Sequence, residues 1–133
     1  MSRENVEVIR EALEAVNRRE REAWLALHDP EAEFRAAPEW PEAESVRGRE
    51  AVWDFILGLI DAWEPDDFDM VELVEFRGGK FAGRFRRPVR GKASGVADVL
   101  DYWSVFTFRQ RRILRQEWFA SREEALDAAG LSE

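Results

Sequence analysis

The sequence predicts an α+β fold in which helices from the first half of the chain pack on a largely antiparallel sheet from the second half. Up to Pro65 the apolar residues recur at helical spacings, whereas after Pro65 they mostly alternate with polar residues, as in strands. The chain has 133 residues, of which 45% are hydrophobic, and this is enough for one domain with one core. We therefore expect a single domain spanning residues 1–133.

The first two predicted elements are helices. A helix is expected from Ser2, a plausible N-cap, to between Asn17 and Arg19, because apolar residues recur on one face. These residues are Val6, Ile9, Leu13 and Val16. A second helix is expected over about Glu20 to Leu27, where Pro30 prevents its continuation and a strand follows at Glu33 to Arg35.

An irregular loop and a third helix come next. The segment Ala36 to Ser45 holds two prolines around Trp40, which is typical of an ordered loop without regular structure. The third helix is predicted from Arg49 to Trp63 because its apolar residues form one broad stripe. Pro65 then stops the helix.

The rest of the chain reads as strands followed by a short helix. A hairpin is predicted from Phe68 to Phe76 and from Lys80 to Val89, joined by a glycine turn. A long strand follows over Val96 to Arg109, and a last strand over Ile113 to Ala120. The capping-box sequence that begins at Ser121 opens a terminal helix ending at Gly130.

The long predicted strand is largely apolar on both faces. One face carries Leu100, Tyr102, Ser104, Phe106 and Phe108. The other carries Val99, Asp101, Trp103, Val105 and Thr107. A sheet with two apolar faces is covered on both sides, here by its own helices and by a second subunit. We therefore expect a homodimer through the outer face, with contacts that include Asp101, Trp103, Val105, Arg115 and Glu117.

Charge and composition narrow the class of protein. Without cysteine the chain has no disulfide, thiolate nucleophile or Cys-based metal site, and its net charge of -8 opposes nucleic-acid binding. The basic stripe from Arg77 to Lys92 is read as outward residues of hairpin strands, with binding of an anion as the alternative. No apolar run approaches the roughly 20 residues of a membrane span, and the start lacks the apolar core of a signal peptide. We expect a cytoplasmic protein without membrane contact.

Several short segments, spread over nearly the whole chain, carry a family resemblance. They are Asn5 to Glu7 through Asn17-Arg18, Leu27 to Phe34, Arg47 to Val52, Val105 to Arg109 with Ile113 to Arg115, Arg122 to Leu126 and Ala129 to Leu131. In order and spacing they resemble the SnoaL-like family of the nuclear transport factor 2-like (NTF2-like) superfamily. The resemblance implies a cone-shaped α+β fold, in which N-terminal helices pack on a strongly curved mixed or antiparallel sheet and enclose a pocket.

The resemblance does not carry over the best-known chemistry of this fold, which hosts enzymes of many kinds and proteins without known activity. Related ketosteroid isomerases use a carboxylate base and an oxyanion hole of Tyr and protonated Asp. The matching positions here are Ala36, Ala12 and Ser104, and none of them supplies those groups. The acid that related cyclases carry on the last strand aligns near Phe119 and Ala120, where it is also absent.

Strand periodicity predicts which side chains line the pocket. On the inward face of the last strand we expect Leu114, Gln116, Trp118 and Ala120 beside the inward residues of the long strand. The expected ligand-binding residues are Tyr102, Ser104, Gln116 and Trp118, since such pockets combine apolar walls with a few polar groups. Core packing is the alternative for Tyr102 and Trp118. Trp40 is expected to stack on the ligand or to plug the open end of the cone.

Two weak candidates for catalysis remain. Asp98 lies near the start of the long strand, at a position whose side chain points to the inner face. If its carboxylate is buried there, it can act as an acid or base; the alternative is a solvated residue at a strand end without such a role. His28, the only histidine, has Asp29 beside it to orient the ring; the alternative is a cation at a helix C-terminus, stabilised by the helix dipole. Because no second histidine or His-x-Glu pair exists, we expect no bound metal, and no cofactor is indicated.

The leading hypothesis is a small-molecule-binding protein with a largely apolar conical pocket for an apolar or aromatic ligand. One alternative is an acid/base enzyme of the polyketide cyclase, isomerase or epoxide hydrolase type, using Asp98 or the His28 and Asp29 pair. A further alternative is a non-catalytic dimeric association module whose pocket is filled by its own side chains.

Overall fold

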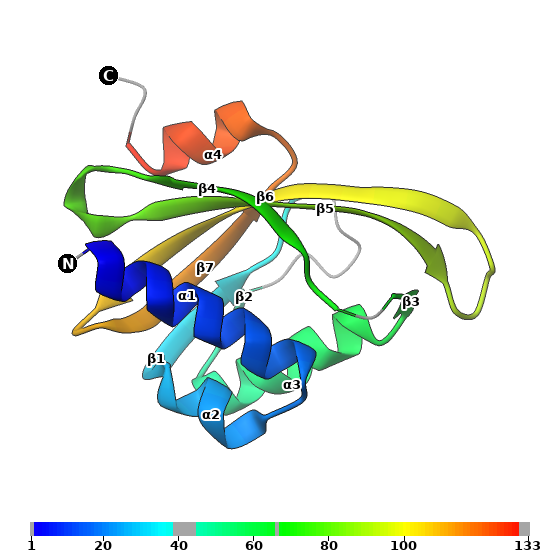
Figure 1. Ribbon diagram of the computed structural model, residues 1–133, viewed down its shortest axis with the longest axis horizontal. Helices are drawn as coiled ribbons and strands as arrows, with labels where there is room; N and C mark the ends of the chain where they lie inside the picture. The colour runs from blue at the N-terminus through cyan, green and yellow to red at the C-terminus, as the bar shows by residue number, and fades with distance from the viewer. Residues whose placement is uncertain (1, 39–44, 66, 131–133) are drawn as a thin grey trace.

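The structure, a computed structural model, describes residues 2–38, 45–65 and 67–130 and has an α+β fold (Figure 1). The helices are α1 (Ser2–Asn17), α2 (Arg21–Ala26), α3 (Arg49–Ile60) and α4 (Arg122–Ala128). The strands are β1 (His28–Arg35), β2 (Ser45–Arg47), β3 (Trp63–Glu64), β4 (Met70–Glu75), β5 (Phe81–Gly91), β6 (Ala97–Arg109) and β7 (Arg112–Phe119). A short 3-10 turn, Arg77–Gly79, joins β4 to β5.

One mixed, curved sheet organises the molecule. Within the described residues its strand order is β2-β1-β7-β6-β5-β3, and β4 also pairs with β5. The pairing of β1 with β7 is parallel, whereas the other pairs are antiparallel. In Figure 1, α1, α2 and α3 lie on one side of the sheet and α4 on the other. This arrangement confirms the predicted fold class, with helices packed on a strongly curved mixed sheet.

The helices form where the apolar periodicity predicts them. Ile9 and Val16 on the inner face of α1 are buried. Packing of such an apolar face against the core is what stabilises an amphipathic helix in a protein. α3 differs from the prediction because it ends at Ile60 and not at Trp63. The difference arises because Trp63 and Glu64 pair with β5 as the short strand β3.

The first strand begins at His28, before its predicted start at Glu33. The backbone N–H of Ile113 donates to the Leu27 carbonyl (3.0 Å) and sets His28 opposite Ile113 in β7. The pairing is irregular between His28 and Glu33, in the stretch that contains Pro30, which has no N–H to donate. The strand therefore begins five residues earlier than predicted, at the only histidine of the chain.

Two tight turns set the register of the antiparallel strands. The predicted glycine turn between β4 and β5 occurs, with Gly78 at a positive φ of 81°. Gln110 and Arg111 join β6 to β7 with φ values of 52° and 67°, as a two-residue hairpin with the favoured twist requires. In the pairing of β5 with β6, Phe85 lies opposite Tyr102, and both side chains belong to the inner face, which faces α1, α2 and α3.

The outer face of the sheet is covered by the chain itself over part of its area. The Oγ of Ser121 accepts a hydrogen bond from the backbone N–H of Glu124 (3.2 Å), so the predicted N-cap of α4 is present. α4 packs Ala125 and other small residues onto Trp103 and Val105, which are 4% and 0% exposed. Trp103 and Val105, which were expected to contact a second subunit, are thus covered by α4 of the same chain.

Candidate functional site

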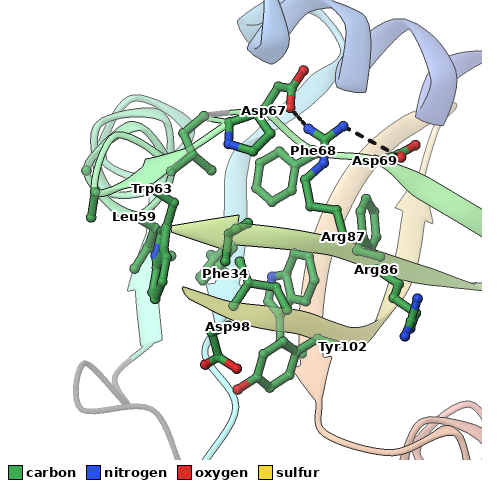
Figure 2. A pocket seen from close by; sticks show the side chains of 18 residues that line it. Phe34, Leu59, Trp63, Asp67, Phe68, Asp69, Arg86, Arg87, Asp98 and Tyr102 are labelled. Atoms are coloured by element: carbon green, nitrogen blue, oxygen red, sulfur yellow. Dashed lines mark ion pairs between the residues drawn. The ribbon is translucent and has the colours of Figure 1, made fainter. Parts of the chain in front are cut away.

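A cavity of about 400 Å³, called the outer cavity here, opens at one end of the inner face of the sheet (Figure 2). Its walls come from the end of α3, residues of the segments 62–65 and 67–69, the strands β5 and β6, Phe34 of β1 and Trp118 of β7. The apolar lining residues are Phe34, Leu59, Ile60, Trp63, Phe68, Phe85, Val89, Leu100 and Trp118, with small contributions from Gly58, Ala62 and Pro65.

Aromatic rings form the deep wall of the outer cavity. The Trp118 ring centre lies 5.0 Å from that of Phe85, 6.0 Å from that of Phe68 and 6.1 Å from that of Phe34. Tilted and offset aromatic contacts at such distances favour the packing of these rings against one another. The deep wall therefore offers an apolar aromatic surface to a ligand.

Phe68 holds its place because of a distant side chain. The amide of Asn17, at the end of α1, donates to the Phe68 carbonyl (3.0 Å) and accepts from the Phe68 N–H (2.8 Å). The sequence analysis assigned Phe68 to a strand and not to the site. The only sequence signal is an aromatic residue within an acidic stretch directly after a helix-stopping proline.

The rim of the outer cavity is charged, and its charges are paired. Arg87 forms ion pairs with Asp67 and, at 3.7 Å, with Asp69 (Figure 2). On the outer face, Asp101 accepts from Arg84 at 2.7 and 2.9 Å and lies 3.5 Å from Arg86. Arg84 holds the pKa of the Asp101 carboxyl below its usual value. These members of the basic stripe are thus engaged with carboxylates of the same chain.

The predicted ligand-binding residues divide between two environments. Tyr102 and Trp118 line the outer cavity, and Figure 2 shows Tyr102 projecting at its edge. Ser104 is 0% exposed and its Oγ makes no hydrogen bond within the described residues. Met70 packs closely beside Gly83, the partner of Ser104 in β5, and this fills the space on that row. Trp40 lies outside the residues that the structure describes.

Gln116 and His28 line a second, much smaller space of about 20 Å³, called the inner cavity here. It lies between the helices and the sheet, and its lining residues are Ile9, Ala12, Leu13, Val16, Trp24, His28, Ile56, Phe68, Phe106, Ile113 and Gln116. The His28 ring stacks on Trp24 with centres 3.6 Å apart, and its Nδ1 lies 2.8 Å from the Trp24 carbonyl oxygen. Burial lowers the pKa of His28 to about 4, so the ring is neutral at pH 7 and Nδ1 is the donor. The alternative of a cationic histidine at a helix end does not hold.

The structure does not bring His28 and Asp29 together. The Asp29 carboxylate accepts from Arg109 at 2.8 and 3.0 Å and from the Glu31 N–H at 2.8 Å. Arg109 is the main reason that the pKa of Asp29 lies below its usual value. Successive residues of a strand point to opposite faces, which separates the two side chains.

Asp98 lies at the rim of the outer cavity and is exposed. Its carboxylate accepts a hydrogen bond from the neighbouring Val99 N–H (2.7 Å). Asp98 and Tyr102 share one face of β6, and Figure 2 shows both at the same edge of the cavity. They are the polar groups of β6 that a ligand in the outer cavity would meet.

Other charges of the outer face pair with each other. Asp101, which we expect at a contact with a second copy, binds Arg84 of the neighbouring strand within the chain. Glu117 accepts from Arg35 (3.0 Å), and Arg115 lies 3.3 Å from Glu33. Among the described residues, no three His, Cys, Asp or Glu side chains are gathered as metal ligands. None of the described helices is long and apolar enough to cross a membrane.

Comparison with solved structures gives several similar folds. An NTF2-like protein from Burkholderia xenovorans LB400 has 18% sequence identity and a TM-score of 0.78, covering 96% of this chain and 97% of its own. TerC co-crystallised with polyporic acid has 17% identity and a TM-score of 0.72, with 93% and 96% covered. Rv0760c from Mycobacterium tuberculosis, in complex with estradiol-17beta-hemisuccinate, has 15% identity and a TM-score of 0.71, with 90% and 95% covered.

These likenesses concern the fold, because the identities are low. No curated protein matches the sequence significantly. The sequence pattern of the SnoaL-like domain, however, matches residues 9–116, which include the second half of α1, all of α2 and α3, most of the sheet and most lining residues of both cavities. The chain therefore belongs to the SnoaL-like domain family, with an NTF2-like fold.

Proposed function

We propose that the protein binds a small, largely apolar or aromatic molecule in the outer cavity. The observation that carries this proposal is the cavity of about 400 Å³ walled by aromatic and aliphatic side chains, with polar groups at its rim. Small-molecule sites have this composition and a comparable size. Two proteins of similar fold hold ligands of this type, polyporic acid and an estradiol derivative. The SnoaL-like domain and the similar structures support a small-molecule binding or cyclase role at the level of the family.

The size of the cavity argues against an association module whose pocket is filled by its own side chains. That alternative requires the inner face to be packed shut, as Ser104 and Met70 are at the next rows of the sheet. The outer cavity instead leaves space beside Trp118, Phe85 and Leu100. Space lined by aromatic rings is costly to leave empty, since the lining atoms lose dispersion contacts that a ligand restores.

Leu100→Trp tests the proposal. Leu100 lines the outer cavity, and a larger ring there occupies the volume that a ligand needs. The neighbouring residue Val99 is on the opposite face of β6 and is 46% exposed, so Val99→Trp adds the same ring outside the cavity. Titration with the fluorescent probe anilinonaphthalene sulfonate should show affinity reduced about tenfold or more in Leu100→Trp and unchanged in Val99→Trp. No probe binding by the wild-type chain, or equal binding by both variants, would refute the proposal.

The exposure of Asp98 argues against acid/base catalysis by this residue. Asp98 lies at the rim of the outer cavity beside Tyr102, but its carboxylate is solvated and lacks the burial on which that role depends. Binding is therefore the function that the outer cavity supports best.

We also propose that two copies associate through the outer face of the sheet. α4 covers Trp103 and Val105, so the part left for a partner is the polar area around Asp101, Arg115 and Glu117. Opposite charges alternate on this area, and such a pattern is self-complementary when two copies meet across a two-fold axis.

A further inference from the structure

The inner and outer cavities meet at one side chain. Phe68 is the only residue that lines both of them among the described part of the chain. Its ring stacks against Trp118 on the outer side, and the inner cavity begins on its other side. The two spaces are thus neighbouring compartments separated by Phe68.

The inner cavity contains polar groups without protein partners. The Nδ1 of His28 is bound to the Trp24 carbonyl, which leaves Nε2 as an acceptor. Within residues 2–38, 45–65 and 67–130 the hydrogen bond of the His28 ring is the one to Trp24, and both His28, which is buried, and Gln116, which is half-buried, line the inner cavity. An acceptor and an amide that border one small, otherwise apolar compartment point to a bound oxygen atom.

The dimensions of the inner cavity fit that interpretation. Its volume of about 20 Å³ exceeds the roughly 10–15 Å³ that one water-sized group needs. A hydroxyl group is both donor and acceptor, so it can donate to the His28 Nε2 and accept from the Gln116 amide at once. A carbonyl oxygen lacks the proton that His28 requires, and a charged group is disfavoured by the apolar surroundings.

The backbone of Phe68 is fixed, whereas its side chain has space to change rotamer. Both of its backbone groups are hydrogen-bonded to Asn17, so the backbone is fixed. The outer cavity offers free volume on one side of the ring. A change of side-chain rotamer toward that volume would connect the two compartments, and such changes need no rearrangement of the sheet.

From this geometry we propose that the inner cavity is the polar end of the ligand site, where His28 and Gln116 bind a hydroxyl group of an otherwise apolar ligand after Phe68 turns aside. The proposal rests on the proposed function and specifies its ligand class, an aromatic or alicyclic alcohol or phenol. His28 and Gln116 are ligand-binding residues in this arrangement, and Phe68 controls access to them.

Two probes that differ by one hydroxyl group test the proposal. The affinities of naphthol and naphthalene are measured by displacement of anilinonaphthalene sulfonate from the wild-type protein. Naphthol should bind about tenfold more tightly, the effect of one well-formed hydrogen-bonding group. Equal affinities would overturn the proposal while leaving the proposed function intact. Failure of all three probes to bind would overturn both.

Variants locate the hydroxyl group. His28→Phe keeps a ring against Trp24 and removes Nε2, and Gln116→Leu removes the amide. In each variant the ratio of the naphthol affinity to the naphthalene affinity should fall close to one. The naphthalene affinity itself should stay within about twofold of the wild-type value. Gln110→Leu, at the exposed turn between β6 and β7, is the matched control and should keep the preference. If His28→Phe does not fold, as judged by circular dichroism, Gln116→Leu alone decides; a naphthol preference unchanged in Gln116→Leu would overturn the proposal.

A crystal structure of the naphthol complex distinguishes a ligand hydroxyl from a buried water. The proposal expects the naphthol oxygen in the inner cavity within hydrogen-bonding distance of the His28 Nε2, with the Phe68 ring displaced. A water molecule in the inner cavity, together with naphthol confined to the outer cavity, would overturn it.

Discussion

At the scale of single residues, His28 illustrates how burial decides protonation. The sequence places it beside Asp29, which would favour a charged ring. The structure turns Asp29 toward Arg109 and buries His28 against Trp24, so the pKa of His28 falls to about 4 from an ordinary value of 6.5. The lowered pKa follows from the fold and was not readable from neighbouring residues.

This lowered pKa predicts a pH dependence of stability. Above pH 6.5 His28 is neutral in the folded and unfolded chain, so it contributes no pH dependence. Between pH 6.5 and about 4 only the unfolded chain binds the proton, and the free energy of unfolding should fall by roughly 3 kcal/mol over that range. Urea unfolding of the wild-type chain at a series of pH values measures the decline.

His28→Phe is the control for this prediction. Without the imidazole the decline between pH 6.5 and about 4 should be largely absent. The pKa values of Asp29, Asp101 and Glu33 are also lowered, from ordinary values of 3.8, 3.8 and 4.5. The loss of stability that they cause begins at about pH 5 and lies mainly below the range of His28, so it remains in the control variant. An identical pH profile in wild type and His28→Phe would show that His28 is not the group responsible.

At the scale of elements, α4 is short and depends on its N-cap. Ser121 accepts a hydrogen bond from the Glu124 N–H, and the helix that follows covers Trp103 and Val105. Ser121→Ala should therefore lower the free energy of unfolding by about 1 kcal/mol, measured by urea unfolding. Ser121→Asp, which keeps a capping oxygen, should remain close to wild type. A Ser121→Ala variant as stable as wild type would mean that the cap does not hold α4.

Most elements were predictable because their signals are local. The helical spacing of Ile9 and Val16 and the alternation around Phe85 and Tyr102 depend only on neighbours in the sequence. The strands β3, of two residues, and β2, of three residues, were missed because segments this short cannot display an alternation of apolar and polar residues. Their pairing is decided by strands far along the chain, β5 and β1.

The candidate site was predictable only in part, for a related reason. Strand parity correctly grouped Tyr102, Ser104, Gln116 and Trp118 on the inner face, but parity does not say how deep each residue lies. Ser104 is fully buried opposite Gly83, against which Met70 packs, and Gln116 lines a separate small compartment. Phe68 belongs to the wall because Asn17 fixes its backbone, a contact between residues 51 positions apart.

At the scale of the whole molecule, the outer face predicts how copies associate. If two copies meet through the polar area around Arg115 and Glu117, light scattering at micromolar concentration should give the mass of a dimer, and added salt should favour the monomer. Salt acts this way because it screens opposite charges at an accessible interface. A monomer at low salt would contradict the proposed association.

The parallel pairing of β1 with β7 has a consequence for synthesis of the chain. Arg35 and Glu117, which form an ion pair across these strands, are 82 residues apart. On a ribosome, β1 emerges early and waits for its partner until nearly the whole chain has been made, and closing so long a loop is slow. Phe34 and Trp118 come together in the deep wall of the outer cavity only after that step. The binding compartment is therefore among the last features that a newly made chain acquires.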